Sequence, residues 1–195
     1  MDAIKTSPPR KLTRQTRRTA DLSHNQFRLV VGQKGGVSAG VAYAGKTPVF
    51  HAEGESPDGV AGLLRSQIDA DLAERRQRQP SDWSDADFSL ALHLVSARLN
   101  PLQTHALQRI AQLDGDAISL DELVWPSSFS ADAMQRAFSR LLKMIVQALD
   151  PKTGRSSEAS KETIVQFAGD AGVGPWKLTQ AFRKAAADFI EGGTR

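Results

Sequence analysis

Residues 27–72, FRLVVGQKGGVSAGVAYAGKTPVFHAEGESPDGVAGLLRSQIDADL, decide the fold class of this chain. Three short runs in this stretch are rich in strand-forming residues, and turns that contain glycine separate them. The runs are Phe27–Val31, Val37–Tyr43 and Thr47–Ala52. Alternation of apolar residues within the second run is typical of a strand with one buried face. The stretch therefore predicts three consecutive strands.

A helix is expected directly after the third strand. Ser56 can cap it and Pro57 suits its first position. Its apolar residues recur at helical spacing, and a charged run over 74–78 ends it. They are Val60, Leu63, Leu64, Ile68 and Leu72. Residues 24–79 are thus predicted to form a β-β-β-α module.

The remainder of the chain, residues 80–195, is predicted to be helical. After a polar linker at 79–82, capping residues and apolar periodicity indicate helix starts near Ser84, Asn100 and Ser130. The predicted fold class is α+β, a small β-β-β-α module followed by a helical domain with a C-terminal helix-turn-helix at 160–190. The order of helix 101–113, segment 120–124 and helix 130–149 also fits the core of a second, winged-helix-like unit, although no residue requires it.

Positive charge is concentrated at the N-terminus. The whole chain carries a net charge of +3, whereas residues 1–22 hold six cations and two anions, a net charge of +4. The cations are Lys5, Arg10, Lys11, Arg14, Arg17 and Arg18. Residues 1–23 lack apolar periodicity and are predicted to be a disordered basic arm. Such an arm can follow a phosphate backbone or serve only as a solvated tail.

The segment Ile164–Lys184, IVQFAGDAGVGPWKLTQAFRK, carries the functional prediction. A helix to about Asp170, a glycine-containing turn and a helix from Pro175 to Ile190 would form a helix-turn-helix. Polar and aromatic residues then lie away from Leu178 and Phe182, where a recognition helix contacts bases and phosphates. These candidates are Trp176, Lys177, Thr179, Gln180, Arg183 and Lys184.

This segment resembles the helix-turn-helix of AraC-type regulators and the corresponding segment of TetR-type repressors. The resemblance implies that Ala168, Gly172, Val173, Leu178 and Phe182 build the motif, while Trp176, Lys177, Gln180 and Arg183 face DNA. A plain helical hairpin that completes a bundle would show the same pattern. The β-β-β-α module more distantly resembles a HicB-like antitoxin domain, on Glu53-Gly54-Glu55-Ser56, or a double-stranded RNA-binding domain.

The preferred interpretation is that the β-β-β-α module mediates association with a second copy of the chain or with a protein partner. An exposed strand edge at Phe27–Val31 or Thr47–Ala52 invites such pairing.

Other function classes find little support in the sequence. The chain has no cysteine, which excludes disulfides, thiolate metal sites and a thiol nucleophile. His24, His51, His93 and His105 do not pair at ligand spacing, and no nucleophile–base set or phosphate loop is present. We therefore expect no catalytic residue, cofactor or metal. Because no secretory or membrane-spanning segment is recognised, a cytoplasmic location is expected.

These observations together predict a protein without enzymatic activity that binds nucleic acid, more readily DNA than RNA. It would act as a regulator or as an accessory subunit of a larger bacterial or phage assembly. The alternative is a non-enzymatic protein-interaction subunit or antitoxin-like adaptor, whose helical hairpin docks onto a partner protein.

Overall fold

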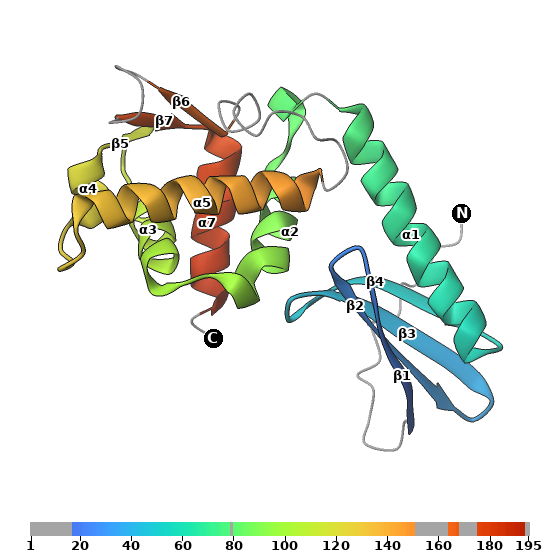
Figure 1. Ribbon diagram of the computed structural model, residues 1–195. Coiled ribbons are helices and arrows are strands. Elements are labelled where there is room, and N and C mark those ends of the chain that lie inside the picture. Colours follow the sequence, from blue (N-terminus) through green and yellow to red (C-terminus); the bar gives the residue numbers. More distant parts are fainter. Residues whose placement is uncertain (1–16, 79, 151–163, 168–174, 194–195) are drawn as a thin grey trace, which may run out of the picture.

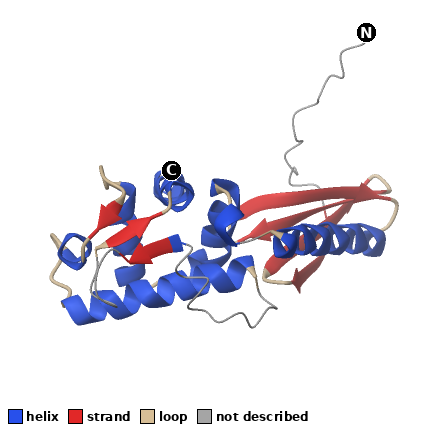
Figure 2. Ribbon diagram, turned by 90° about the horizontal axis from the view of Figure 1, so that it is seen from above, coloured by secondary structure: helices blue, strands red, loops and turns tan. Residues whose placement is uncertain are grey.

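The computed structural model of the chain describes residues 17–78, 80–150, 164–167 and 175–193. It is a mixed α+β structure in which a four-stranded antiparallel sheet and a long helix precede a compact group of helices (Figure 1). Seen from above, the long helix lies along one face of the sheet, and the remaining helices gather beyond the end of the sheet (Figure 2). The predicted α+β class is thus confirmed.

The N-terminal sheet has four strands in chain order, β1-β2-β3-β4. They are β1 (Arg17–His24), β2 (Phe27–Lys34), β3 (Val37–Ala44) and β4 (Thr47–Gly54). Two-residue turns join them, and positive φ angles at Asn25, Gln26, Gly35 and Gly36 suit the twist of antiparallel hairpins. Three strands occur where the sequence predicts them.

The first strand corrects two predictions. Residues 17–23 are paired with β2 and do not belong to a disordered arm. Because β1 covers β2, the edge predicted at Phe27–Val31 is not free, whereas β4 does lie at an edge. The sequence RRTADLSH hid this strand because an edge strand with one covered face contains few apolar residues.

Helix α1 (Pro57–Gln77) covers one face of this sheet. Its N-cap is Ser56, whose Oγ accepts a hydrogen bond from the Gly59 N–H at 3.2 Å. Gly40 of β3 allows the close approach, since a Cβ there would lie 2.7 Å from a Val60 methyl group. The inward face is fully buried, but the predicted core residue Leu63 is 50% exposed.

The helical part begins with a short 3₁₀ turn, η1 (Pro80–Asp82), and the capping residues start its helices where the sequence predicts. Ser84, Asn100, Ser119 and Ser130 each accept a hydrogen bond from a backbone N–H three residues later. The elements are α2 (Asp85–Val95), η2 (Ser96–Arg98), α3 (Pro101–Ala111), α4 (Leu120–Val124), α5 (Ala131–Leu149) and α7 (Gln180–Gly193).

A second, small sheet replaces the predicted C-terminal helix-turn-helix. Its strands are β5 (Ala117–Ile118), β6 (Val165–Phe167) and β7 (Trp176–Leu178), in the order β5-β7-β6. The helix predicted up to Asp170 is therefore wrong over 165–167, and the helix predicted from Pro175 is wrong over 176–178. In β7 the burial alternates, with Trp176 and Leu178 inward and Lys177 outward, because β5 and β6 supply pairing partners. The intervening turn at 168–174 lies outside the described residues.

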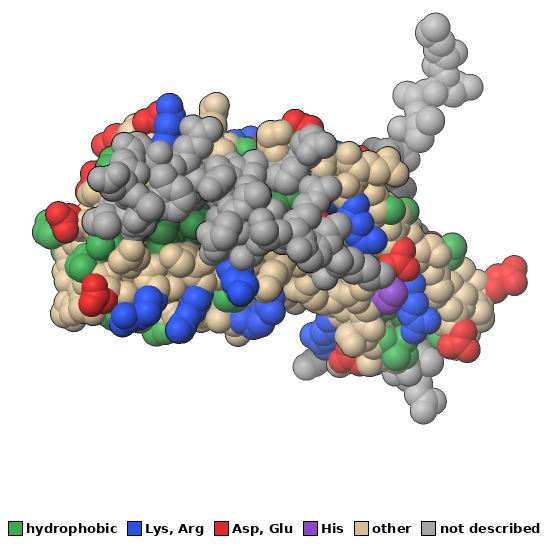
Figure 3. All heavy atoms as spheres, turned by 45° about the horizontal axis from the view of Figure 1, so that its top comes forward, with side chains coloured by type: hydrophobic (Ala, Val, Ile, Leu, Met, Phe, Trp, Pro, Cys, Tyr) green, Lys and Arg blue, Asp and Glu red, His purple; other side chains and the backbone are tan. Residues whose placement is uncertain are grey.

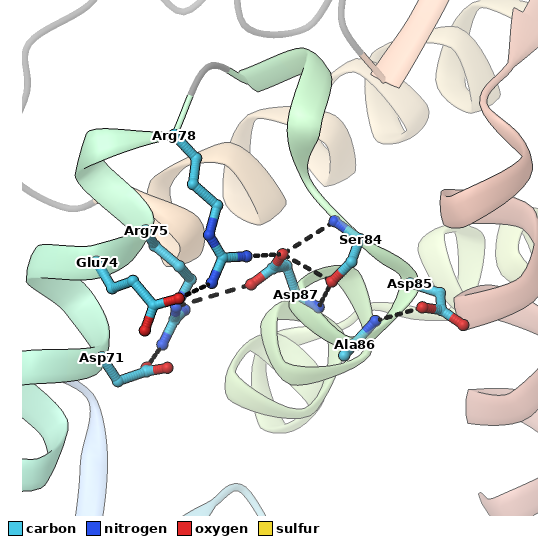
Figure 4. A network of polar contacts seen from close by, with 8 residues as sticks. All are labelled: Asp71, Glu74, Arg75, Arg78, Ser84, Asp85, Ala86 and Asp87. Atoms are coloured by element: carbon cyan, nitrogen blue, oxygen red, sulfur yellow. Dashed lines mark hydrogen bonds and ion pairs between the residues drawn. The ribbon is translucent and has the colours of Figure 1, made fainter.

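The two parts of the molecule are joined at both ends of α2. Near its start, Asp87 accepts a hydrogen bond from Arg78 Nη1 at 3.0 Å and lies 3.9 Å from Nε of Arg75 (Figure 4). Arg75 is only 2% exposed and also contacts Asp71 of its own helix. Desolvation lowers the pKa of Arg75, while the nearby Asp87 acts to raise it.

Near the other end of α2, the turn between β3 and β4 packs on the helix. Oγ1 of Thr47 lies 3.0 Å from Nδ1 of His93, and burial lowers the pKa of this imidazole. A Cβ at Gly45 would come within 2.5 Å of the His93 carbonyl oxygen. Polar and steric contacts therefore fix the sheet against the helical part, although the sequence indicated only a linker between them.

Candidate nucleic-acid interface

Helices α3, α4 and α5 pack on one another and are followed by a strand pair. The order along the chain is α3-β5-α4-α5-β6-β7, and the strands are arranged as β5-β7-β6. This is the element order and strand order of a winged helix, the arrangement that residues 100–149 indicated in part. In such a unit α4 and α5 correspond to the two helices of a helix-turn-helix, and α5 takes the place of the recognition helix.

Helix α5 is strongly amphipathic. Its inner face, which includes Phe138, Leu141 and Ile145, is buried against α2, α3 and α4. Phe138 packs on Trp176 of β7 with ring centroids 5.2 Å apart. The small sheet thereby holds α5 in place from behind and leaves its outer face exposed.

The outer face of α5 carries three exposed cations. Arg136, Arg140 and Lys143 are spaced by four and three residues, so they lie in one stripe along the helix. Within the part of the chain that the structure describes, no ion pair joins these three side chains to an acidic residue. Figure 3 shows Lys and Arg side chains in a row over the surface that α5 forms. We call this set the α5 stripe.

The turn that leads into α5 contains an exposed aromatic ring. Trp125, which ends α4, is 67% exposed, and the Arg109 guanidinium lies 5.6 Å from the centre of its ring. Nε of Arg109 also donates to the Glu122 carbonyl oxygen at 3.0 Å. The arginine therefore holds the indole at the surface in a fixed position, close in sequence to the Ser130 cap of α5.

The structure does not place the site residues predicted from the sequence on the outer face of one recognition helix. Trp176 is 3% exposed and belongs to the core, so it is not available to a base or a phosphate. Lys177 points outward from β7, and its Nζ lies 3.2 Å from the Asp116 carboxylate. This contact lowers the pKa of Asp116. Oγ1 of Thr179 caps α7 by accepting from the Phe182 N–H at 3.3 Å.

The other predicted residues lie on α7. Gln180 is its first residue and is exposed, while Arg183 Nη2 donates to the Leu113 carbonyl oxygen at 3.3 Å. Lys184 forms an ion pair with Asp85, which lowers the pKa of Asp85 and raises that of the lysine. These side chains surround one cavity together with Lys177 and Thr179, and they do not form the outer face of a helix-turn-helix. Whether they contact DNA stays a prediction.

The predicted basic arm is only partly described. Lys5, Arg10, Lys11 and Arg14 lie outside the described residues, whereas Arg17 and Arg18 belong to β1.

Sequence reasoning missed the α5 stripe, although its signal was present. The apolar residues that predicted the helix over 130–149 define its inner face, and the residues between them include Arg136, Arg140 and Lys143. The sequence pattern favours 164–184 instead, because the glycine-containing segment at 171–174 fits the turn of a helix-turn-helix.

The side chains of His24, His93 and His105 make structural contacts. His24 lies 2.9 Å from an Asp69 carboxylate oxygen, and His105 packs on Phe129. Among the described residues, no three His, Asp or Glu side chains are grouped as a metal site would require. No helix in the same part of the chain is long and apolar enough to cross a membrane.

Comparisons with models of known families, with curated proteins and with solved structures found no match for this chain. The geometry of α5 and its surroundings is therefore the basis on which a function is proposed below.

Proposed function

We propose that this protein binds double-stranded DNA with α5 lying in the major groove. The observation that carries the proposal is the α5 stripe, three exposed cations that form no ion pair with any described residue, on the outer face of the helix that follows α4. The same geometry suits a regulator or an accessory subunit that positions a larger assembly on DNA.

The dimensions of the helix support this role. The 19 residues of α5 span about 28 Å, and the three cations are distributed over about 10 Å of that length. The major groove of B-form DNA is about 12 Å wide and admits one α-helix. Arginine forms paired hydrogen bonds with guanine, and lysine serves phosphates well. Duplex RNA is a poorer partner, because its major groove is too deep and narrow for a helix.

The charge distribution favours α5 over α7. Lys177 and Lys184 are each held by a carboxylate, which an approaching phosphate would have to displace. Arg136, Arg140 and Lys143 need no such exchange. Each phosphate contact of the α5 stripe then gains the full binding free energy of counter-ion release from DNA.

The decisive experiment measures binding of the full chain to a random 30-base-pair duplex by fluorescence anisotropy over a range of salt concentrations. Arg136→Ala, Arg140→Ala and Lys143→Ala should each reduce the salt slope by about 0.9 if the residue contacts a phosphate. An arginine that reads a base should instead cost about 1–3 kcal/mol at a preferred site. Arg65→Ala, an exposed arginine on α1, is the matched control and should leave binding unchanged.

Two results would contradict the proposal. If the triple variant of the α5 stripe keeps the affinity and the salt slope of the parent, α5 is not the interface. If Gln180→Ala and Arg183→Ala abolish binding while the stripe variants do not, the helix predicted from sequence is the one that contacts DNA. Absence of salt-dependent binding would favour the protein-interaction alternative, in which the free edge of β4 is the first surface to examine.

A further inference from the structure

A cavity of about 680 Å³ opens between the end of α3, strand β7 and the first two turns of α7. Its apolar wall is formed by Ile110, Leu113, Leu178 and Ala187. The volume lies within the range of small-molecule sites, which hold an apolar body against such a wall and orient it with a few polar groups. No lining residue belongs to α5, so the cavity is separate from the α5 stripe.

The polar side of this cavity is positively charged. Arg183, Lys177 and Lys184 line it, against a single lining carboxylate, Asp116. The two lysines are 55% and 63% exposed at the rim, where an anion in the cavity would compete with their carboxylate partners. The N-terminal end of α7, beside them, adds the positive end of a helix dipole.

Arg183 is the most informative residue of the cavity. One of its terminal nitrogens donates to the Leu113 carbonyl oxygen, but its Nε is buried and has no hydrogen-bond partner among the described residues. Buried donors in folded proteins are normally satisfied. Water does not reach this Nε, so an anion in the cavity would meet the other terminal nitrogen, Nη1, which is not among the buried side-chain atoms without a partner in the described residues. A carboxylate or phosphate matches the geometry of a guanidinium.

We propose that this cavity binds a small organic anion, with an apolar body against Leu113, Leu178 and Ala187 and a carboxylate or phosphate group at Arg183. Lys177 and Lys184 attract the anion at the rim. This inference does not depend on DNA binding, and its test is independent of the test for the α5 stripe.

The experiment titrates the ¹⁵N-labelled full chain with three probes that share one ring and differ in head group, and follows the binding by NMR. Benzoate and phenyl phosphate should produce saturable shifts of the Arg183 Nε–H and of the amides at 177–187, while benzamide should bind at least tenfold more weakly. The tighter of the two anions identifies the preferred head group.

Two variants test the site itself. Arg183→Gln keeps a donor for Leu113 and should weaken both anions at least tenfold, whereas the matched control Arg65→Gln should not change their affinity. Ala187→Leu fills the apolar side without changing the charge and should weaken all three probes. If Arg183→Gln lowers the melting temperature, Ala187→Leu becomes the variant that tests whether the cavity is the binding site. Equal binding of benzamide and the anions, shifts outside this cavity, absence of saturable shifts, or unchanged affinity in Arg183→Gln and Ala187→Leu would each overturn the proposal.

Discussion

Replacing Gly45 by alanine tests how the N-terminal sheet is held against the helical part. Gly45 has a φ of +60°, and an added Cβ would lie 2.5 Å from the His93 carbonyl oxygen and 2.6 Å from Oγ of Ser96. Gly35 has the same φ of +60°, but an added Cβ would meet nothing within 4 Å. The two glycines therefore form a matched pair that differs only in the contact with α2 and η2.

The magnitude follows from these distances. Alanine in the left-handed region costs about 1–2 kcal/mol at either position. At Gly45 the Cβ must also retreat by about 0.9 Å to reach an ordinary contact of 3.4 Å with the His93 carbonyl oxygen. Forced repacking of this kind costs about 1–3 kcal/mol, and loss of the Thr47–His93 hydrogen bond adds about 1 kcal/mol. Gly45→Ala should therefore destabilise the protein by about 2–4 kcal/mol more than Gly35→Ala.

The assay is equilibrium unfolding of the full chain in urea, followed by far-ultraviolet circular dichroism. The difference between the free energies of unfolding of Gly45→Ala and Gly35→Ala cancels the cost of the left-handed backbone conformation. It leaves the cost of the contact between residue 45 and the end of α2. If the two free energies of unfolding agree within about 0.5 kcal/mol, the β3–β4 turn does not pack on the end of α2, and the described junction is incorrect.

Two further predictions concern polar networks. Asp87→Ala should cost about 3–5 kcal/mol in urea unfolding, because it leaves Arg75 buried beside Asp71 alone. Asp85→Ala, on the same turn but half-exposed, should cost clearly less. Equal effects of the two variants would refute a role for the buried pair. At the start of α4, the Ser119 N–H and Oγ donate to Glu122, and these bonds lower the pKa of that carboxyl group. Ser119→Ala should raise the Glu122 pKa only part of the way to its ordinary value, because the larger contribution comes from the backbone N–H, which the variant keeps. Carbon-detected NMR titration measures this pKa. No change in the variant would show that the capping box is absent. Since the folded pKa lies below the unfolded value of about 4.3, this stabilisation is complete above that pH and is lost as the pH falls through the folded pKa.

Local signals in the sequence were sufficient for most elements. Ser56, Ser84, Asn100 and Ser130 mark helix starts that the structure confirms, because a cap acts within four residues of the chain. The glycine turns likewise located strands β2 to β4.

Local signals failed where pairing with distant residues decides the conformation. The run Trp176–Leu178 fits the first turn of a helix as well as it fits a strand. Its partners, Ala117–Ile118 and Val165–Phe167, select the strand, and no local pattern reports them. β1 was missed for the same reason, since its pairing with β2 stabilises a sequence of weak strand propensity.

The sequence by itself therefore determined the α+β class, the capped helix starts and the apolar face of α5, all of which depend on residues a few positions apart. Only the tertiary structure decided which surface is left for a ligand. It buried Trp176, paired Lys177 and Lys184 with carboxylates, and left Arg136, Arg140 and Lys143 exposed and unpaired among the described residues. The reason is that a side chain's availability depends on the elements packed around it, which in this chain come from positions as distant as Asp85 and Lys184.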